Sequence, residues 1–189
     1  MSEVKITPKG EKMDAKMKGM VMSGMVVLSV LLGILAVTGM SWLTADEDGV
    51  EANYGLSEAE VSMGSIEITV DWGEACDEDD DDESCEAATA GTIGTIGLWI
   101  GIIMAAVFAA MMILPMAGID AMDGMPEIAQ KIISWGAGGM MLLGTIGWMI
   151  MMPELESEFG YGMSFFMAII AGLLALGTPL MDMFVPADE

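Results

Sequence analysis

The sequence predicts an all-α membrane protein: a four-transmembrane-helix bundle with a small extracellular antiparallel β-sheet in its first outer loop. The first observation is that the chain, which is 54% hydrophobic, contains four long apolar runs. Runs of about twenty residues match the hydrocarbon thickness of a bilayer. The second is that most of the 29 acidic residues lie between these runs, whereas a soluble acidic protein spreads them along the whole chain. These features exclude a soluble globular domain and a disordered acidic chain.

The four candidate spans contain almost no charge. They cover residues 20–43, 91–116, 132–152 and 161–185, and Asp182, near the end of the fourth, is the one charged residue inside them. At about 1.5 Å per residue the first span reaches ~36 Å, which is enough to cross a bilayer with some tilt. The rest of the chain then forms the end segments and connections 1–19, 44–90, 117–131, 153–160 and 186–189.

The lysines predict the side of the membrane on which each connection lies. Five of the six precede the first span and the sixth, Lys131, lies between the second and third, so all six fall on one side of a four-span protein. The positive-inside rule makes that side cytoplasmic. We therefore expect a multi-pass protein of the plasma membrane, with both termini cytoplasmic and the 44–90 loop outside.

A cleaved signal peptide is an alternative interpretation of the first span. Lysines precede the span, and Leu43-Thr44-Ala45 loosely resembles a cleavage site. Its apolar run is longer than that of a typical signal peptide, which favours a retained span.

The 44–90 loop contains the pattern of a β-strand. Between residues 66 and 72, isoleucine, valine and tryptophan alternate with polar residues. This period of two is typical of a half-buried strand whose apolar side faces the helix ends or another strand. A lone strand leaves its backbone groups unpaired, so we expect a partner strand between residues 54 and 61 and a turn at 62–65.

Cys76 and Cys85 are the only two cysteines, and both fall in the predicted outer loop. An oxidising exterior favours a disulfide between them, which would close a loop of about ten residues and contribute ~2–3 kcal/mol in the chain-entropy model. A paired-thiolate metal site is the alternative, but the further Cys or His ligands that zinc requires are missing.

Seven consecutive carboxylates, residues 77–83, lie inside this closed loop. The simpler interpretation is a solvated acidic surface, of the kind found in halophilic or marine adaptation. The alternative is a weak Ca²⁺ or Mg²⁺ site, because these cations prefer oxygen ligands. Its ligands would be Asp79, Asp80, Asp81 and Asp82. No EF-hand spacing is present, which favours the solvated surface.

The second span carries a stripe of small residues at successive spacings of four: Gly97, Gly101, Ala105 and Ala109. The stripe begins with a GxxxG pattern, which lets another helix backbone approach closely. The other spans also contain small residues, so we expect the stripe to pack within one four-helix bundle. Homo-oligomerisation through the second span is the alternative.

The residue inventory argues against catalysis. The chain has no His and no Arg, and no nucleophile–base pair, metal triad or nucleotide loop can be assembled from its residues. We expect no enzyme activity, no cofactor, no tightly bound metal and no nucleic-acid partner. Ionisable residues are absent from the centres of the spans, which disfavours an ion channel or a secondary transporter.

Methionine is abundant, with 23 residues. Clusters such as Met111, Met112 and Met116 have the soft thioether ligands that Cu(I) prefers. The methionines are scattered over all four spans, however, which is more typical of a flexible apolar filler.

Five aromatic residues fall near the predicted ends of the spans: Trp42, Trp99, Trp135, Trp148 and Tyr161. Trp and Tyr gather at both membrane–water interfaces of membrane proteins. We therefore expect these five to lie at the interfaces.

The first outer loop also holds a pattern of Trp and Cys. Trp42 directly follows the first span, and Val70-Asp71-Trp72 precedes Cys76 and Cys85. In these residues and in its plan the chain resembles the claudin and peripheral-myelin-protein superfamily, whose first loop has a Trp, a Gly-Leu-Trp and two disulfide-bonded cysteines. Here Val-Asp replaces Gly-Leu, the gap before the first cysteine is one residue longer, and the family's Arg is missing. The resemblance implies four spans, cytoplasmic termini and strands in the first outer loop; a convergent four-span protein is the alternative.

We expect a structural or interaction protein of the cell envelope whose outer acidic loop contacts neighbouring molecules or cations. Its partners would be the lipid bilayer, further copies or other membrane proteins, and weakly bound divalent cations. An accessory subunit of a larger membrane complex is the main alternative, and an oligomeric pore or a Cu(I)-handling transport component is less favoured.

Overall fold

The computed structural model describes residues 13–47, 49–79, 82–119, 125–153, 159–185 and 187–188. Within these residues four helices are long and apolar enough to cross a membrane, as the sequence predicts. They are α1 (Ala15–Thr38), α3 (Asp82–Ile113), α4 (Glu127–Met151) and α5 (Met163–Phe184). The shorter elements at their ends are α2 (Trp72–Asp79), the 3-10 turn η1 (Pro115–Ala117), and the paired strands β1 (Met13–Asp14) and β7 (Ala187–Asp188).

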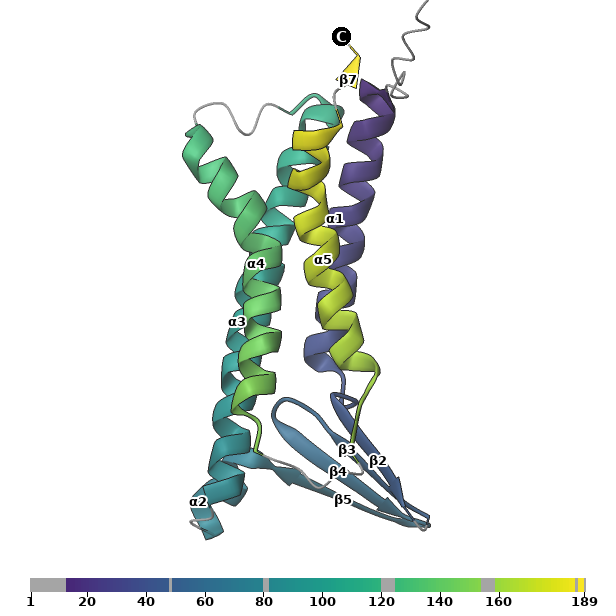
Figure 1. Ribbon diagram of the computed structural model, residues 1–189, viewed down its shortest axis with the longest axis vertical. Helices are drawn as coiled ribbons and strands as arrows, with labels where there is room; N and C mark the ends of the chain where they lie inside the picture. Colours follow the sequence, from purple (N-terminus) through teal and green to yellow (C-terminus); the bar gives the residue numbers. More distant parts are fainter. Residues whose placement is uncertain are drawn as a thin grey trace, which may run out of the picture.

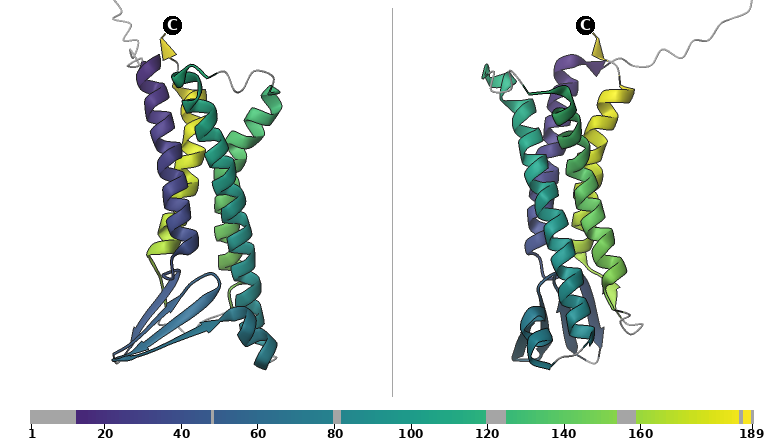
Figure 2. Two further views of the ribbon diagram at one scale, coloured as in Figure 1. Left: turned by 180° about the vertical axis from the view of Figure 1, so that it is seen from behind. Right: turned by 90° about the vertical axis from the view of Figure 1, so that its left-hand side faces the viewer.

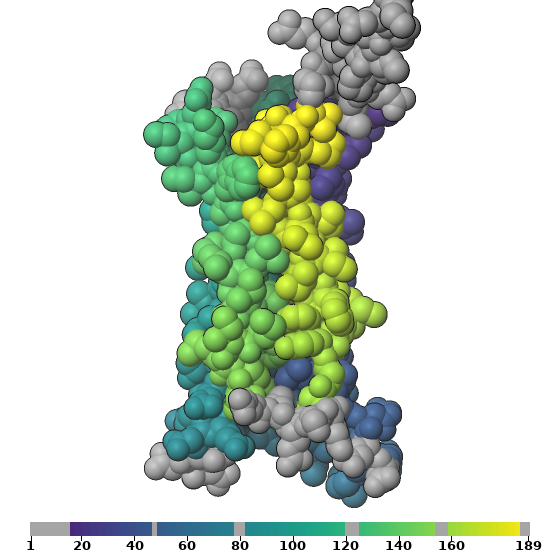
Figure 3. Space-filling view, in the orientation of Figure 1, coloured from purple at the N-terminus to yellow at the C-terminus, as the bar shows by residue number. Residues whose placement is uncertain are grey.

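The four long helices form one bundle (Figure 1). Helix α1 packs along α5 and α3, and α4 packs along α3 and α5, so that α4 and α5 lie side by side on the face shown in Figure 3. The start of α1, the end of α5 and the start of α4 lie at one end of the bundle, here called the lysine end because it carries Lys16, Lys18 and Lys131. The strands β2 to β5 lie at the opposite end, here called the sheet end.

Two helices end or begin well away from the expected span boundaries. Helix α1 ends at Thr38 rather than at residue 43, because Leu43 already belongs to a strand. Helix α3 begins at Asp82 rather than at residue 91, because the acidic segment continues the same helix. Asp82 and Glu83 lie in its first turn, where carboxylates complement the helix dipole.

A five-stranded antiparallel sheet lies at the sheet end, with the order β5-β4-β3-β2-β6. Four strands follow α1 in the chain: β2 (Leu43–Glu47), β3 (Val50–Tyr54), β4 (Glu58–Met63) and β5 (Ile66–Asp71). The fifth, β6 (Gly160–Tyr161), directly precedes α5 and pairs with β2. The sheet therefore joins the connection after α1 to the connection before α5.

The expected partner of the 66–71 strand is confirmed, because β4 pairs antiparallel with β5, but its expected bounds of 54–61 are wrong. Strand β3 ends at Tyr54 and β4 begins at Glu58, because the backbone turns at residues 55–57, where the Gly55 N–H donates to the Glu58 carbonyl (2.8 Å). Leu56, inside this turn, is buried next to Gly91 of α3. This packing anchors the sheet to the bundle.

The following turn is tighter than the predicted 62–65 because β4 continues to Met63. Gly64 provides the turn with a φ of 62°, a left-handed conformation that favours glycine. A glycine with positive φ also lies in the turn between β2 and β3, where Gly49 has a φ of 81°.

The expectation that the apolar side of β5 is half-buried is also wrong. All six residues of β5 are exposed, and Ile66, Ile68 and Val70 are 58%, 48% and 39% exposed. The reason is that β5 is an edge strand of a sheet that extends past the ends of α1 and α5 (Figures 1 and 2), so nothing in the described chain covers this face.

Trp42 and Trp148 are buried inside the protein and do not face outward, as residues that contact the surrounding interface would. Both are buried, at 0% and 1% exposure, and their rings meet edge to face at 4.9 Å where the sheet joins the helices. Phe165 of α5 completes the cluster, 6.2 Å from Trp42. Trp99, Trp135 and Tyr161 are 43%, 40% and 49% exposed on the outside of the protein.

The small-residue stripe of α3 is buried against α4. Gly97, Gly101, Ala105 and Ala109 all lie in the interior of the bundle. A methyl group on Gly97 would lie 2.5 Å from Gly144 Cα, and one on Gly101 would lie 2.8 Å from the Ala137 carbonyl oxygen. The stripe thus forms a close helix crossing inside the bundle, and it is not free to join a second copy.

Candidate interaction surface

The register of the sheet sorts its side chains onto two chemically different faces, because residues directly opposite one another project to the same side. The face here called the apolar face has three rows: Leu43–Tyr54–Ala59–Val70, Ala45–Ala52–Val61–Ile68 and Val50–Met63–Ile66. The opposite face, here called the acidic face, carries Asp46, Glu51, Glu58, Glu60, Glu67 and Asp71.

Burial of the apolar face falls toward the turns and also toward the edge strand β5, where Val70 is 39% exposed. In the row nearest the bundle, Leu43 and Ala59 are 7% and 4% exposed, and Leu43 belongs to the same apolar cluster as Trp148. In the row nearest the turns, Met63 and Ile66 are 47% and 58% exposed. The uncovered part, here called the apolar patch, consists of Met63, Ile66, Ile68 and Val70. Adjacent exposed apolar residues on an edge strand are typical of an interaction site.

The surroundings of the apolar patch are strongly anionic. Residues 44–90 include seventeen Asp and Glu and no Lys or Arg. Like charges on two such surfaces repel at low ionic strength, with a range of about 10 Å at 0.1 M salt. A partner with a basic rim around an apolar contact therefore fits this surface better than a second copy does.

An aromatic junction holds the apolar face to the bundle. Tyr54 stacks on Trp72 at 5.4 Å and meets Phe159 edge to face at 5.0 Å. The backbone N–H of Trp42 donates to the Tyr54 carbonyl (2.8 Å), and the backbone N–H of Gly162 donates to the Trp42 carbonyl (2.9 Å). Burial in this junction raises the pKa of Tyr54, because it disfavours the charged phenolate.

The predicted disulfide between Cys76 and Cys85 is present and joins α2 to the start of α3. The two Cα atoms are 4.7 Å apart, within the usual range for such a bond. The crosslinked segment is largely helical, rather than the extended loop that charge repulsion would favour.

The suggested cation ligands are only partly placed by the structure. Asp79 ends α2 and Asp82 begins α3, whereas Asp80 and Asp81 lie outside the described residues. Among the residues that are described, no three Asp, Glu, His or Cys side chains come together as a metal site.

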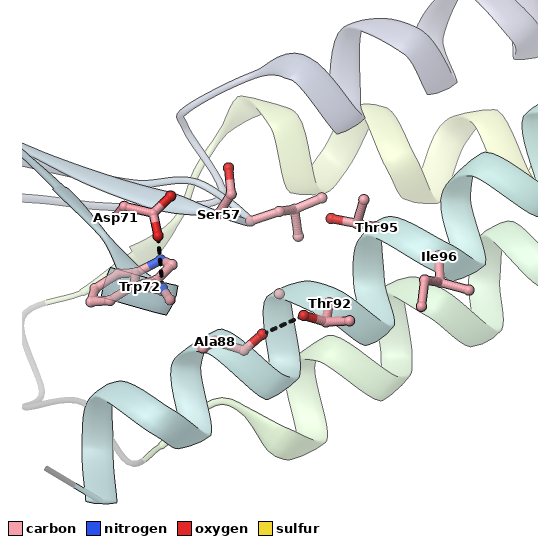
Figure 4. Close-up of a pocket in the computed structure, with 10 residues that line it drawn as sticks. Ser57, Asp71, Trp72, Ala88, Thr92, Thr95 and Ile96 are labelled. Atoms are coloured by element: carbon pink, nitrogen blue, oxygen red, sulfur yellow. Dashed lines mark hydrogen bonds between the residues drawn. The ribbon is translucent and has the colours of Figure 1, made fainter. Parts of the chain in front are cut away.

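A cleft of about 320 Å³ lies between the end of β5 and helix α3 (Figure 4). The lining side chains include Ser57, Thr92 and Thr95 and a single carboxylate, Asp71. The Asp71 carboxylate accepts hydrogen bonds from the backbone N–H groups of Gly73 (2.8 Å) and Glu74 (3.0 Å). Asp71 therefore caps α2, and we interpret the cleft as part of the connection between sheet and helix.

Sequence reasoning missed the residues that place the apolar patch. The β2–β3 hairpin carries a signal in Asp48-Gly49, a dipeptide typical of tight hairpin turns. The contact between Tyr54 and Phe159 has no signal of this kind, because it joins residues that are far apart in the chain.

Comparisons with known proteins do not place the chain in a family. No protein-family model matches it, and no curated protein has a significantly similar sequence. The fold therefore defines its class: a four-helix protein whose helices could span a membrane, with an antiparallel sheet at one end.

Proposed function

We propose that this chain is an integral membrane protein of the cell envelope that binds a neighbouring protein through the apolar patch. The observation that carries the proposal is the exposure of Ile66, Ile68 and Val70 on one side of the edge strand β5, together with Met63 on the neighbouring strand β4. The bundle anchors the sheet, and the aromatic junction keeps its orientation fixed.

The proposed topology puts the sheet end outside the cell. Lys16, Lys18 and Lys131 lie at the other end of the bundle, which supports a cytoplasmic location for that end and for both termini. Leu43 on the apolar face packs in the same cluster as Trp148, so we infer that this face is turned toward the helices and that its exposed part would lie near the membrane surface. This geometry favours a partner in the same membrane.

Site-specific photo-crosslinking tests the proposal. Benzoylphenylalanine is placed at Ile68, in the apolar patch, or at the adjacent Glu67, which projects from the acidic face of the same strand. We expect residue 68 to crosslink to a neighbouring protein in native membranes and residue 67 to crosslink far less. Equal yields at the two positions, or no adduct at 68, would contradict the proposal.

The mass of the adduct decides between the candidate functions. A different protein recovered in fixed proportion would favour the accessory-subunit alternative, in which the chain belongs to a larger membrane complex. An adduct of two copies would favour self-assembly over a basic-rimmed partner. We do not favour copper transport, because the methionines serve unrelated packing roles: Met141 is buried in the core, whereas Met20 is 61% exposed.

We also propose that the likeness to the claudin and peripheral-myelin-protein superfamily reflects a shared arrangement of four spans and a first outer loop with strands and a disulfide. The position of Trp42 after α1, and of Trp72 before a disulfide that precedes α3, supports it. The absence of Arg and the altered Gly-Leu-Trp remain differences from that family.

A further inference from the structure

A second cleft opens at the lysine end, where the first turns of α4 diverge from α5 (Figures 1 and 2). All four long helices line it, and its volume of about 570 Å³ lies in the range of small-molecule sites. Its apolar wall consists of Met22, Phe108, Met112, Trp135, Pro179 and Met183. Flexible thioether chains of this kind adapt to irregular apolar ligands.

The charges at the cleft fall into two groups. Lys18 is 7% exposed and donates to the Asp182 carboxylate at 2.9 Å, so these two charges neutralise each other. Glu127 and Lys131 lie one turn apart on α4 and both line the cleft. Neither forms an ion pair with a described residue. Within the part of the chain that the structure describes, one wall of the cleft thus offers a carboxylate and an ammonium group that have no ion-pair partner.

The position of the cleft limits what can fill it. With the bundle in a bilayer, the apolar wall faces hydrocarbon, where water finds few hydrogen-bond partners, and the two charges lie toward the head groups. The acyl chain of a lipid can pack against the apolar wall. A head group that bears a phosphate and an ammonium matches Lys131 and Glu127, because charge-assisted hydrogen bonds form to both groups.

We propose that this cleft binds one membrane phospholipid with a zwitterionic head group. Its phosphate lies beside Lys131, its ammonium lies beside Glu127, and one chain lies against Met112 and Met183. The inference rests on the membrane placement proposed above, and it is independent of partner binding by the apolar patch.

Native mass spectrometry of the full chain tests the proposal. The protein is reconstituted in nanodiscs with equal amounts of phosphatidylethanolamine and phosphatidylglycerol and then released into mild detergent. We expect one retained ethanolamine lipid per chain, with Lys131→Gln and Glu127→Gln each lowering retention about tenfold. Glu67→Gln on the acidic face is the matched control and should retain the lipid.

A variant that blocks the cleft keeps the test decisive if a charge variant fails to fold. Met183 lines the cleft but is 67% exposed, so Met183→Trp narrows the site without disturbing the core. We expect it to lose the lipid while its thermal unfolding stays unchanged. Equal retention of both lipids, no retained lipid, unchanged retention in the variants, or a second copy bound in place of lipid would each overturn the proposal.

Discussion

Trp42 connects the helix bundle to the sheet through both its side chain and its backbone. Its indole Nε1 donates to the Ala36 carbonyl (2.9 Å), at the end of α1, while its ring packs against both Trp148 and Phe165, which also contact each other. Its backbone bonds to Tyr54 on one side and Gly162 on the other. One buried residue therefore connects β3, the segment that follows β6, and the three helices α1, α4 and α5.

We expect Trp42→Ala to lower the free energy of unfolding by about 3–5 kcal/mol, the usual cost of removing a fully buried aromatic ring. Trp99 is 43% exposed on the outside of the bundle, and Trp99→Ala is the control, with a much smaller loss. Circular dichroism during denaturation in detergent measures both variants. Equal losses would show that the aromatic cluster does not support the fold.

Tyr54 makes the junction sensitive to alkaline pH. Its pKa is raised in the folded protein, so folding favours the neutral phenol. The burial of the neutral Tyr54 phenol therefore contributes fully to the stability of the fold below the unfolded pKa of about 10. This contribution is lost as the pH rises through the higher pKa of the folded protein.

The chain has only two tyrosines, so Tyr161→Phe leaves Tyr54 as the single phenol to be followed. We expect ultraviolet titration of this variant to give an apparent pKa above that of the same chain unfolded in denaturant. In addition, Tyr54→Phe should remove part of the alkaline loss of stability. Identical titration curves for the folded and unfolded chains would contradict the assigned burial.

At the scale of the elements, the crossing of α3 and α4 depends on glycine at both positions of closest approach. A methyl group on Gly144 would lie 2.9 Å from Gly97 Cα and 3.1 Å from the backbone nitrogen of Leu98. These are backbone atoms, so the contact cannot be relieved by a side-chain rotation. By contrast, a methyl group on Gly139, in the same helix, meets nothing within 4 Å.

We expect Gly144→Ala to destabilise the bundle by about 1–3 kcal/mol through overpacking. Gly139→Ala should be neutral or stabilising by up to ~1 kcal/mol, because alanine favours helix more than glycine does. Thermal unfolding in the same detergent compares the two variants directly. If both lose stability equally, the glycines of α4 reflect composition and not close packing.

At the scale of the whole molecule, the lysines that the structure describes are confined to one end. The lysine end holds Lys16, Lys18 and Lys131, whereas the sheet end holds the acidic residues of the 44–90 segment. This asymmetry predicts a single orientation in the membrane.

We expect a cysteine introduced at Glu51, in β3, to react with an impermeant maleimide in intact cells. A cysteine at Ser2 should react only after the cells are opened, because the proposed topology puts the N-terminus on the cytoplasmic side. Cys76 and Cys85 are bonded to each other and give no background in the unreduced protein. The reverse pattern of labelling would overturn the proposed topology.

The sequence by itself determined the four apolar helices, the disulfide and the presence of an antiparallel sheet. Each depends on composition or on a short pattern: long apolar runs, two cysteines in one loop, and alternation between residues 66 and 71. Tertiary structure alone decided which surfaces stay exposed. Alternation predicted that β5 has one apolar and one polar face. Whether the apolar face is buried depended on the position of the sheet relative to the helices. The contact between Tyr54 and Phe159 and the β2–β6 pairing fix that position. In the same way, the residue type of Trp42 and its position after the first span predicted an interfacial side chain. Only the packing of α1, α4 and α5 around it buries this side chain in the core. These contacts join residues far apart in the chain, so no local pattern encodes them.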